Sequence, residues 1–268
     1  MSTSTALELK RISHFYVNDG GAALALQNLS LTVEQGEFVS LVGPSGCGKT
    51  TLLSIIAGII LPTEGSVQVS GHRVFGPSPK VGYMLQQDYL FPWRTIEENA
   101  VIGLELNGTL TKENREYVLH LLNQFGLGAQ KGKYPTELSG GMRQRVALVR
   151  TMAVKPDLLL LDEPFSALDY QTKLQLEDLV FETMKSHGKT AVLVTHDISE
   201  AIAMSDRLIV MAPNPGRIRK EIVLPDSIAR SMPLRAREQE GFLQLFHDVW
   251  NEFDAMESGG AGNAVTTG

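Results

Sequence analysis

The chain has 268 residues, of which 43% are hydrophobic and 20% charged, and its formal net charge is −6. This length supplies enough apolar surface for a core without disulfides or structural metals, and the composition excludes a largely disordered chain. The acidic balance lacks the positive excess that binding to a nucleic-acid backbone requires, so we expect no nucleic-acid partner. The single cysteine, the lack of a membrane-length apolar run and the lack of a signal-like start favour the cytoplasm.

Hydrophobic spacing in the first half of the chain predicts strands and then helices. Alternating or apolar runs predict strands at 7–12, 29–33, 38–42, 67–69 and 81–85. A glycine-rich loop after the third of these strands leads into a helical stretch over 49–59. From Thr95, which forms a T-x-x-E capping box with Glu98, the spacing predicts helices to residue 107 and over 111–125. A helical insert therefore follows the first strands.

The second half of the chain returns to strands. A predicted helix over 139–154 leads to the apolar run 158–161, which is typical of a strand covered on both faces. The run 191–195 repeats this pattern after a predicted helix over 170–186, which makes a βαβ unit and an α/β fold. Two further strands and a region of helical spacing are predicted at 208–211, 218–223 and 234–256.

The segment Gly43–Thr50 reads GPSGCGKT and matches the phosphate-binding pattern GxxxxGK[ST]. It lies between a predicted strand and a predicted helix, which is the context that the pattern requires. Its glycines let backbone amides turn toward phosphates, and the helix N-terminus adds its dipole. Lys49 is placed to reach the β- and γ-phosphates, and Thr50 offers a hydroxyl to Mg²⁺. We therefore predict a nucleotide site.

Acidic residues and a histidine follow two neighbouring strands of the predicted sheet. Asp162 and Glu163 come directly after the run 158–161, at the edge of an open α/β sheet where ligands bind. Asp162 fits the acidic partner of Mg²⁺, and Glu163 is placed to accept a proton from an attacking water. His196 follows the next strand and is placed to reach a γ-phosphate. The combination predicts hydrolysis of a nucleotide phosphate.

A second candidate anion site opens the predicted helix over 139–154. It begins with Ser139, Gly140 and Gly141, a serine cap followed by two glycines. One chain therefore carries two phosphate cradles. Either it binds two ligands, or the second cradle closes on the nucleotide held by another copy of the chain.

With these motifs in order, the sequence resembles the ATP-binding subunit of an ABC transporter over residues 7–223. In that reading the motifs are the Walker A loop, the Q-loop glutamine, the signature, the Walker B strand, the D-loop and the switch histidine, at 43–50, 86, 139–144, 158–163, 166–169 and 196. The resemblance implies an α/β P-loop ATPase with a mostly parallel sheet, an antiparallel β edge and an inserted helical subdomain.

The same resemblance suggests how the chain is divided. We expect an ATPase domain over 1–226, with its helical subdomain at about 88–155. A C-terminal helical extension over 227–256 and a disordered tail over 257–268 are expected to follow.

The resemblance also assigns roles to individual residues. Glu163 and His196 are expected to be catalytic, and ATP and Mg²⁺ are the expected ligands. The residues expected to contact ATP in the same chain are Tyr16, Gly43, Pro44, Ser45, Gly46, Cys47, Gly48, Lys49, Thr50, Thr51 and Gln86. Those expected to contact the nucleotide of a second copy are Ser139, Gly140, Gly141 and Gln144. Those expected to hold Mg²⁺ are Thr50, Gln86 and Asp162. Phe15 competes with Tyr16 for stacking on adenine.

Two segments look like the nitrate, sulfonate and taurine importer branch of the family, Phe91–Thr95 and Pro213–Ile218. That branch usually has Arg-Pro-Gly where this chain has Asn-Pro-Gly. The resemblance implies a homodimeric ATPase at the cytoplasmic face of the inner membrane that drives import of a small anion such as nitrate, sulfonate, taurine or bicarbonate. Two transmembrane permease subunits and, indirectly, a solute-binding protein are the expected partners.

Two other functions remain as alternatives. One is a soluble ABC-type ATPase without a permease, acting in repair, translation or cluster assembly. The other is a small-molecule P-loop kinase, which gives no reason for the second cradle.

Two smaller features also carry expectations. Cys47 lies among loop amides that favour its thiolate, so we expect fast alkylation. Basic residues gather late in the chain and are interpreted as a solvated face, with anionic lipid or a regulatory partner as the alternative. They are Arg217, Arg219, Lys220, Arg230, Arg235 and Arg237.

Overall fold

The computed structural model describes residues 4–18, 21–186 and 188–260. Its strands are β1 (Thr5–Asn18), β2 (Gly21–Glu34), β3 (Phe38–Val42), β4 (Glu64–Val69), β5 (His72–Arg73), β6 (Val81–Met84), β7 (Leu158–Asp162), β8 (Thr190–Val194), β9 (Arg207–Ala212) and β10 (Arg217–Val223). Its helices are α1 (Lys49–Ile56), α2 (Ile96–Leu106), α3 (Lys112–Gln124), α4 (Gly140–Ala153), α5 (Tyr170–Ser186), α6 (Ile198–Met204), α7 (Asp226–Ala229), α8 (Pro233–Ala236) and α9 (Phe242–Gly260). Two short 3-10 helices, η1 (Gly128–Gln130) and η2 (Pro135–Glu137), precede α4.

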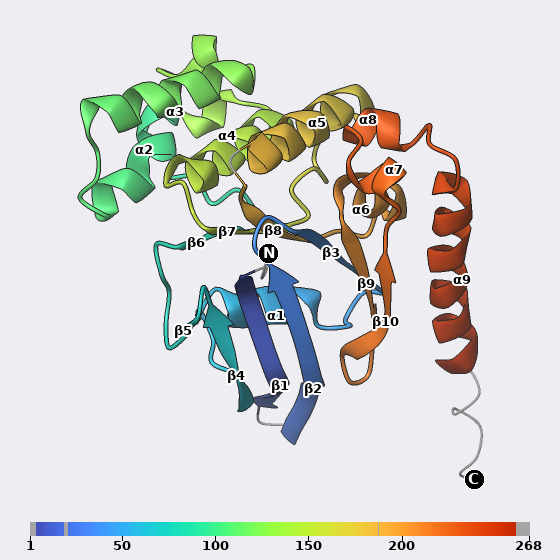
Figure 1. The fold of residues 1–268 in the computed structure, drawn as a ribbon. Helices are drawn as coiled ribbons and strands as arrows, with labels where there is room; N and C mark the ends of the chain where they lie inside the picture. Colours follow the sequence, from blue (N-terminus) through green and yellow to red (C-terminus); the bar gives the residue numbers. More distant parts are fainter. Residues whose placement is uncertain (1–3, 19–20, 187, 261–268) are drawn as a thin grey trace.

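The strands form two sheets (Figure 1). One sheet has the order β2-β1-β4-β5 and is antiparallel. The other has the order β10-β9-β3-β8-β7-β6, in which β10 is an antiparallel edge and the other neighbours run parallel. Because β3, β7 and β8 lie inside this sheet and helices cover it, all of their residues are buried. This is the mixed α/β architecture predicted from the apolar runs.

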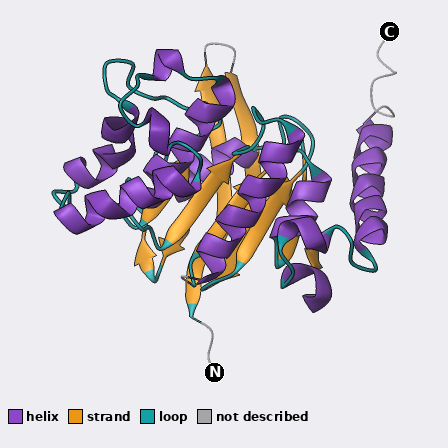
Figure 2. Cartoon of the chain, turned by 90° about the horizontal axis from the view of Figure 1, so that it is seen from above, coloured by secondary structure: helices purple, strands orange, loops and turns teal. Residues whose placement is uncertain are grey.

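Helix α1 lies between the two sheets, with α4, α5 and α6 on the other side of the parallel sheet (Figures 1 and 2). Its residues Leu52, Leu53 and Ile55 are buried in a cluster with Leu7 of β1 and Val39 of β3. This packing fixes the N-terminus of α1 at the end of β3, where the phosphate-binding loop lies.

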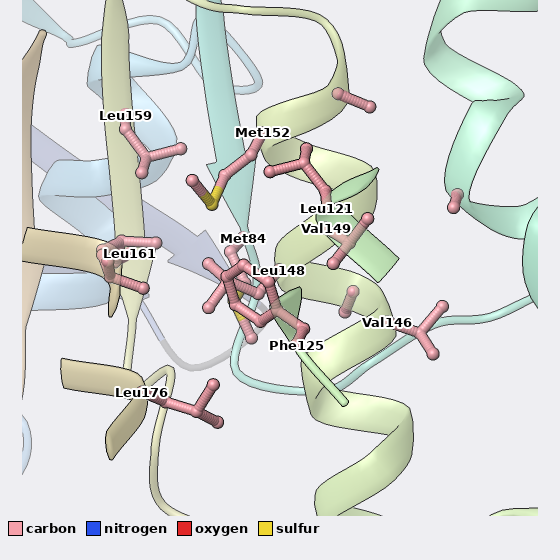
Figure 3. Packing of buried hydrophobic residues seen from close by; sticks show 14 of the residues in the cluster. Met84, Leu121, Phe125, Val146, Leu148, Val149, Met152, Leu159, Leu161 and Leu176 are labelled. Atoms are coloured by element: carbon pink, nitrogen blue, oxygen red, sulfur yellow. The ribbon is translucent and has the colours of Figure 1, made fainter. Parts of the chain in front are cut away.

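Helices α2, α3 and α4 form the insert, and a second apolar cluster attaches them to the parallel sheet. In Figure 3, Phe125 and Leu148 from the insert gather with Met84 of β6, facing Leu161 of β7. All four side chains are almost fully buried. The predicted capping box forms, because Thr95 Oγ1 accepts from the backbone N–H of Glu98 and the Glu98 carboxylate accepts from that of Thr95.

The C-terminal part differs from its prediction. The helical spacing over 234–256 is divided between α8 and α9, because Gly241 adopts φ 88° just before α9 begins. Helix α9 also continues through residues 257–260, which we expected in a disordered tail; residues 261–268 lie outside the described part of the chain. Within the described residues, no helix combines the length and apolarity that crossing a membrane requires.

Candidate active site

The loop between β3 and α1 depends on glycine for its shape. Gly46 and Gly48 adopt φ 78° and 88°, a left-handed conformation that other residues rarely adopt. A Cβ atom at Gly48 would lie 2.6 Å from Cδ2 of Leu26, and one at Gly43 would lie 2.5 Å from the carbonyl oxygen of Met211. The loop therefore needs glycine for both conformation and space.

A cavity of about 370 Å³ lies against this loop, a volume typical of small-molecule sites. It is lined by Tyr16, Ala25, Ser45, Gly46, Gly48, Lys49, Thr50, Thr51, Glu163 and Val194. The structure thus brings the phosphate-binding loop, the aromatic residue of β1 and the carboxylate after β7 to one cavity. Ala25 and Val194 were not predicted, because apolar residues on neighbouring strands carry no chemical signature in the sequence.

Tyr16, and not Phe15, lines the cavity. The two residues lie next to each other on β1, and successive side chains of a strand point to opposite faces. The Tyr16 hydroxyl lies 3.2 Å from Oγ1 of Thr51, and 46% of the residue is exposed. The ring of His14 packs edge-on against that of Tyr16. An exposed, oriented ring beside the phosphate loop is suited to stacking on a base.

Gly43, Pro44 and Cys47 do not line the cavity, although they belong to the loop. The ammonium of Lys49 donates to the carbonyl oxygens of Gly43 at 2.7 Å and Pro44 at 3.1 Å, so these two residues position the lysine. The backbone N–H of Cys47 donates to the Pro44 carbonyl, and the Cys47 side chain is fully buried in the core. This burial removes the basis for the expected fast alkylation.

Asp162 ends β7 with a carboxylate that suits a cation. The residue is 2% exposed, and its Oδ2 has no hydrogen-bond partner within the described chain. Burial raises the pKa of Asp162, while the Thr50 hydroxyl and the Lys49 ammonium act in the opposite direction. A buried oxygen without a partner, next to a threonine hydroxyl, fits a site for Mg²⁺.

The chain supplies only part of such a site. Among the described residues, no group of three or more His, Cys, Asp and Glu side chains is arranged to hold a metal. A site of one carboxylate and one hydroxyl, completed by substrate phosphates and water, is typical for Mg²⁺. The amide nitrogen of Gln86 donates to the Glu163 carboxylate, which leaves the amide oxygen Oε1 as a further candidate ligand of the ion.

The carboxylate of Glu163 is held from two sides. Its Oε2 accepts a hydrogen bond from Nε2 of Gln86 at 3.0 Å, and its Oε1 lies 3.2 Å from Nδ1 of His196. The His196 side chain is 69% exposed, whereas that of Glu163 is 20% exposed. The structure therefore brings together the three residues that were predicted at the ends of β6, β7 and β8.

The backbone of Glu163 is also constrained. Its φ of 50° lies in the left-handed region, which is costly for a residue with a side chain. Its N–H donates to the carbonyl of Val194 at 2.8 Å. Its own carbonyl accepts from Nε2 of Gln144 and from Oγ of Ser166, each at 3.0 Å. These hydrogen bonds hold the carboxylate at the edge of the cavity.

Gln144 takes part in this arrangement within its own chain. The residue is buried, and its Oε1 accepts from the backbone N–H of Ala167 at 3.0 Å while its Nε2 bonds to Glu163. Both ends of its amide are thus hydrogen-bonded within the chain, and its contact with a second copy stays a prediction.

The other residues of the second cradle lie at the N-terminus of α4. Ser139 caps the helix, with its Oγ accepting from the N–H of Met142 at 3.3 Å. Ser139 and Gly140 are exposed, and Gly141 is partly buried against the loop after β7, where a Cβ would lie 3.2 Å from the Ala167 carbonyl. The residues that line the cavity beside Lys49 include none from 139–144.

Known proteins are similar to this chain in sequence and in fold. The profile of the ABC transporter family matches residues 26–166. An uncharacterized ABC transporter ATP-binding protein of Bacillus subtilis, YtlC, is 52% identical over 94% of this chain and 96% of its own length. The taurine import ATP-binding protein TauB of Ruegeria pomeroyi is 42% identical over 94% of this chain and 96% of its own. TauB of Escherichia coli K12 is 42% identical over 80% and 84%.

Solved structures agree with the sequence comparisons. The ATP-binding cassette MJ0796, in a dimeric post-hydrolysis state bound to ADP and Pi, superposes with a TM-score of 0.75. It is 34% identical, and the match covers 82% of this chain and 99% of that one. These likenesses confirm the predicted α/β P-loop fold and the predicted ATPase activity. The chain therefore belongs to the ABC transporter family, as an ATP-binding cassette ATPase.

Proposed function

We propose that this ATPase is the subunit of an importer that couples ATP binding and hydrolysis to passage of a solute through a separate transmembrane permease. The relatives named taurine import ATP-binding proteins support import over the alternative of an ATPase without a permease. A small anion such as taurine, another sulfonate, nitrate or bicarbonate is the proposed solute. The subunit would lie on the cytoplasmic face of the inner membrane, bound to two permease subunits and indirectly served by a solute-binding protein.

The observation that carries the chemistry is the position of the Glu163 carboxylate, between Gln86 and His196 and on the wall of the cavity that holds Lys49. Glu163 accepts the proton of the attacking water, a role worth about 10²–10⁴-fold in rate. Lys49 and the N-terminus of α1 bind the phosphates, and Tyr16 stacks on the base. His196, which is mostly exposed, turns between Glu163 and the γ-phosphate.

Thr50, Asp162 and Gln86 are the residues that would hold Mg²⁺. When bound, this ion neutralises charge on the β- and γ-phosphates as it develops. The buried Oδ2 of Asp162, which has no hydrogen-bond partner among the described residues, supports this assignment.

The proposed working unit is a homodimer. Ser139, Gly140 and Gly141 are placed to contact the nucleotide held by the other copy, because the helix N-terminus they form offers backbone N–H groups away from the chain's own cavity. The dimeric state of the similar cassette supports this arrangement. In each copy we propose an ATPase domain over 1–226, with a helical subdomain at about 88–155, followed by a C-terminal extension.

Purification from a detergent extract tests the proposed partner. The tagged full-length chain is expected to retain a multi-span membrane protein, and vesicles containing both are expected to take up taurine or nitrate only with ATP inside the compartment that holds the ATPase. The matched control is the chain with Glu163→Gln, which should retain the partner but not transport. Recovery of the chain without any multi-span protein would contradict the proposal.

A further inference from the structure

The segment after the ATPase domain places a cation in a buried ion-pair network. Arg237 follows α8, and its Nη2 lies 2.7 Å from Oε2 of Glu177 on α5. Glu177 is fully buried, and neither of its carboxylate oxygens has an aligned hydrogen bond within the described chain. The close charge of Arg237 is therefore the main stabilising contact of Glu177. This arginine was expected on a solvated face, and the structure shows it 16% exposed.

Lys173, one turn earlier on α5, connects Glu177 to the loop that carries His196. Its Nζ lies 2.6 Å from Oε2 of Glu200, 2.7 Å from Oδ2 of Asp197 and 3.9 Å from Oε1 of Glu177. Asp197 directly follows His196 and caps α6 by accepting from the N–H of Glu200 at 3.1 Å. The cap and its attachment to Lys173 thus fix the backbone next to His196.

The network and the reacting groups share a small cavity of about 140 Å³. Glu163 and His196 line it together with Lys173 and Glu200. A shift of Lys173 would therefore change the surroundings of both catalytic side chains. Among the described residues, Glu163 is the one that lines both this cavity and the cavity that contains Lys49 and Tyr16.

The balance of charge in the network depends on Arg237. Two cations, Lys173 and Arg237, face three carboxylates, those of Glu177, Asp197 and Glu200. Without Arg237, Lys173 would be the one cation of the network that is left to compensate the three carboxylates. An unpaired buried carboxylate is strongly unfavourable, so at a pH where Glu177 is ionised, Lys173 would be drawn from Asp197 toward Glu177. The attachment of the His196 loop would then be lost.

We propose that Arg237 is a positioning residue for ATP hydrolysis, which neutralises Glu177 and so leaves Lys173 free to hold Asp197 and, through it, His196 beside Glu163. This inference rests on the catalytic roles proposed above for Glu163 and His196. It gives the C-terminal extension a part in turnover.

Steady-state hydrolysis by the full-length chain at pH 8, above the Glu177 pKa of about 7, tests this role. Arg237→Met is expected to lower kcat on the order of tenfold, within the range of couplings between contacting residues, and to leave the KM for ATP within about twofold. The segment should stay docked, because the N–H of Leu234 donates independently to Asp178 on α5 at 2.9 Å. Arg235→Met is the matched control, since Arg235 is exposed in the same segment and has no ion pair in the described chain. It should leave kcat unchanged.

The double variant Arg237→Met with Glu177→Gln separates positioning from simple structural support. It removes the buried charge together with its partner, so kcat should return to within about threefold of the unaltered chain. This variant also serves if Arg237→Met alone does not fold. An unaltered kcat in Arg237→Met, or a double variant that stays tenfold slow, would overturn the inference. If His196→Ala kept full turnover, the proposed function of His196 itself would fail instead.

Discussion

The side-chain amide of Gln144 donates a hydrogen bond to the carbonyl oxygen of Glu163 at 3.0 Å. Gln144 lies in the first turns of α4, whose N-terminus is the predicted second phosphate cradle, and Glu163 carries the proposed general base. Through this contact, a movement of the N-terminus of α4 would be transmitted to the backbone of Glu163. The side chain of Gln144 therefore connects the predicted second cradle to the proposed general base.

Gln144→Ala should reduce kcat on the order of tenfold, because the left-handed backbone of Glu163 costs about 1–3 kcal/mol and loses one of its restraints. ATP affinity, measured by equilibrium binding, should change little, since Gln144 does not line the nucleotide cavity. Gln124→Ala, at an exposed position at the end of α3, is the control. Unchanged turnover in Gln144→Ala would show that this hydrogen bond does not restrain Glu163.

Cys47 should react slowly with a thiol reagent in the folded chain. It is fully buried and packed in the core cluster between the two sheets, so labelling requires local opening. The measurement is the rate of labelling in buffer and in denaturant, where the same thiol should react at least about a hundredfold faster. Native labelling within a few-fold of the denatured rate would contradict the buried orientation.

Glu177 should make stability depend on pH. Burial raises its pKa from the ordinary value of 4.5 to about 7, with Arg237 and Lys173 opposing and Glu200 adding to the rise. Because the folded pKa is raised, the associated stability is present below the unfolded pKa near 4.5 and is lost as pH rises through about 7. Over this window the loss amounts to roughly 3 kcal/mol at most.

Urea titrations at pH 5 and pH 8 measure this effect. Between these values, the free energy of unfolding should fall less in Glu177→Gln than in the unaltered chain. Glu182→Gln, an exposed position on the same helix, is the control. Identical falls in the unaltered chain and in Glu177→Gln would rule out a protonated Glu177.

The parts of the candidate site that could be predicted from the sequence are those whose residues lie in one short segment or directly after a strand. Gly43–Thr50 needs its glycines within one loop, and Asp162, Glu163 and His196 follow apolar runs that are typical of covered strands. The contact between Arg237 and Glu177 spans 60 positions, and nothing near either residue specifies it. Within a run of basic residues, spacing alone does not distinguish an arginine that forms a buried ion pair from one that is exposed to solvent.

Two other features that the sequence did not predict also depend on the folded conformation of the backbone. The inward direction of Cys47 follows from the left-handed glycines on either side of it, which spacing alone does not reveal. The division between α8 and α9 follows from the conformation of Gly241, since the apolar spacing continues across it.

Complementation tests whether the site is shared between copies. Lys49→Ala and Ser139→Arg chains should each be nearly inactive, whereas a mixture forms heterodimers with one site that carries both defects and one that carries neither. Activity should partly return on mixing. A second readout covers the case in which hydrolysis requires both sites to be intact. The Glu163→Gln variant should elute as a dimer in the presence of ATP, and the double variant Glu163→Gln with Ser139→Arg should elute as a monomer. If mixing restored no activity and the ATP-dependent dimer still formed with Ser139→Arg, a shared site would be excluded.

Hydrolysis by Glu163→Gln tests the central claim, that the carboxylate held between Gln86 and His196 takes the proton of the attacking water. The amide keeps the shape of the side chain but cannot accept the proton, so radiolabelled ATP should bind with nearly unaltered affinity. Its turnover should fall by about 10²-fold or more. Turnover within a few-fold of the unaltered chain would contradict the role of Glu163 and the mechanism built on it.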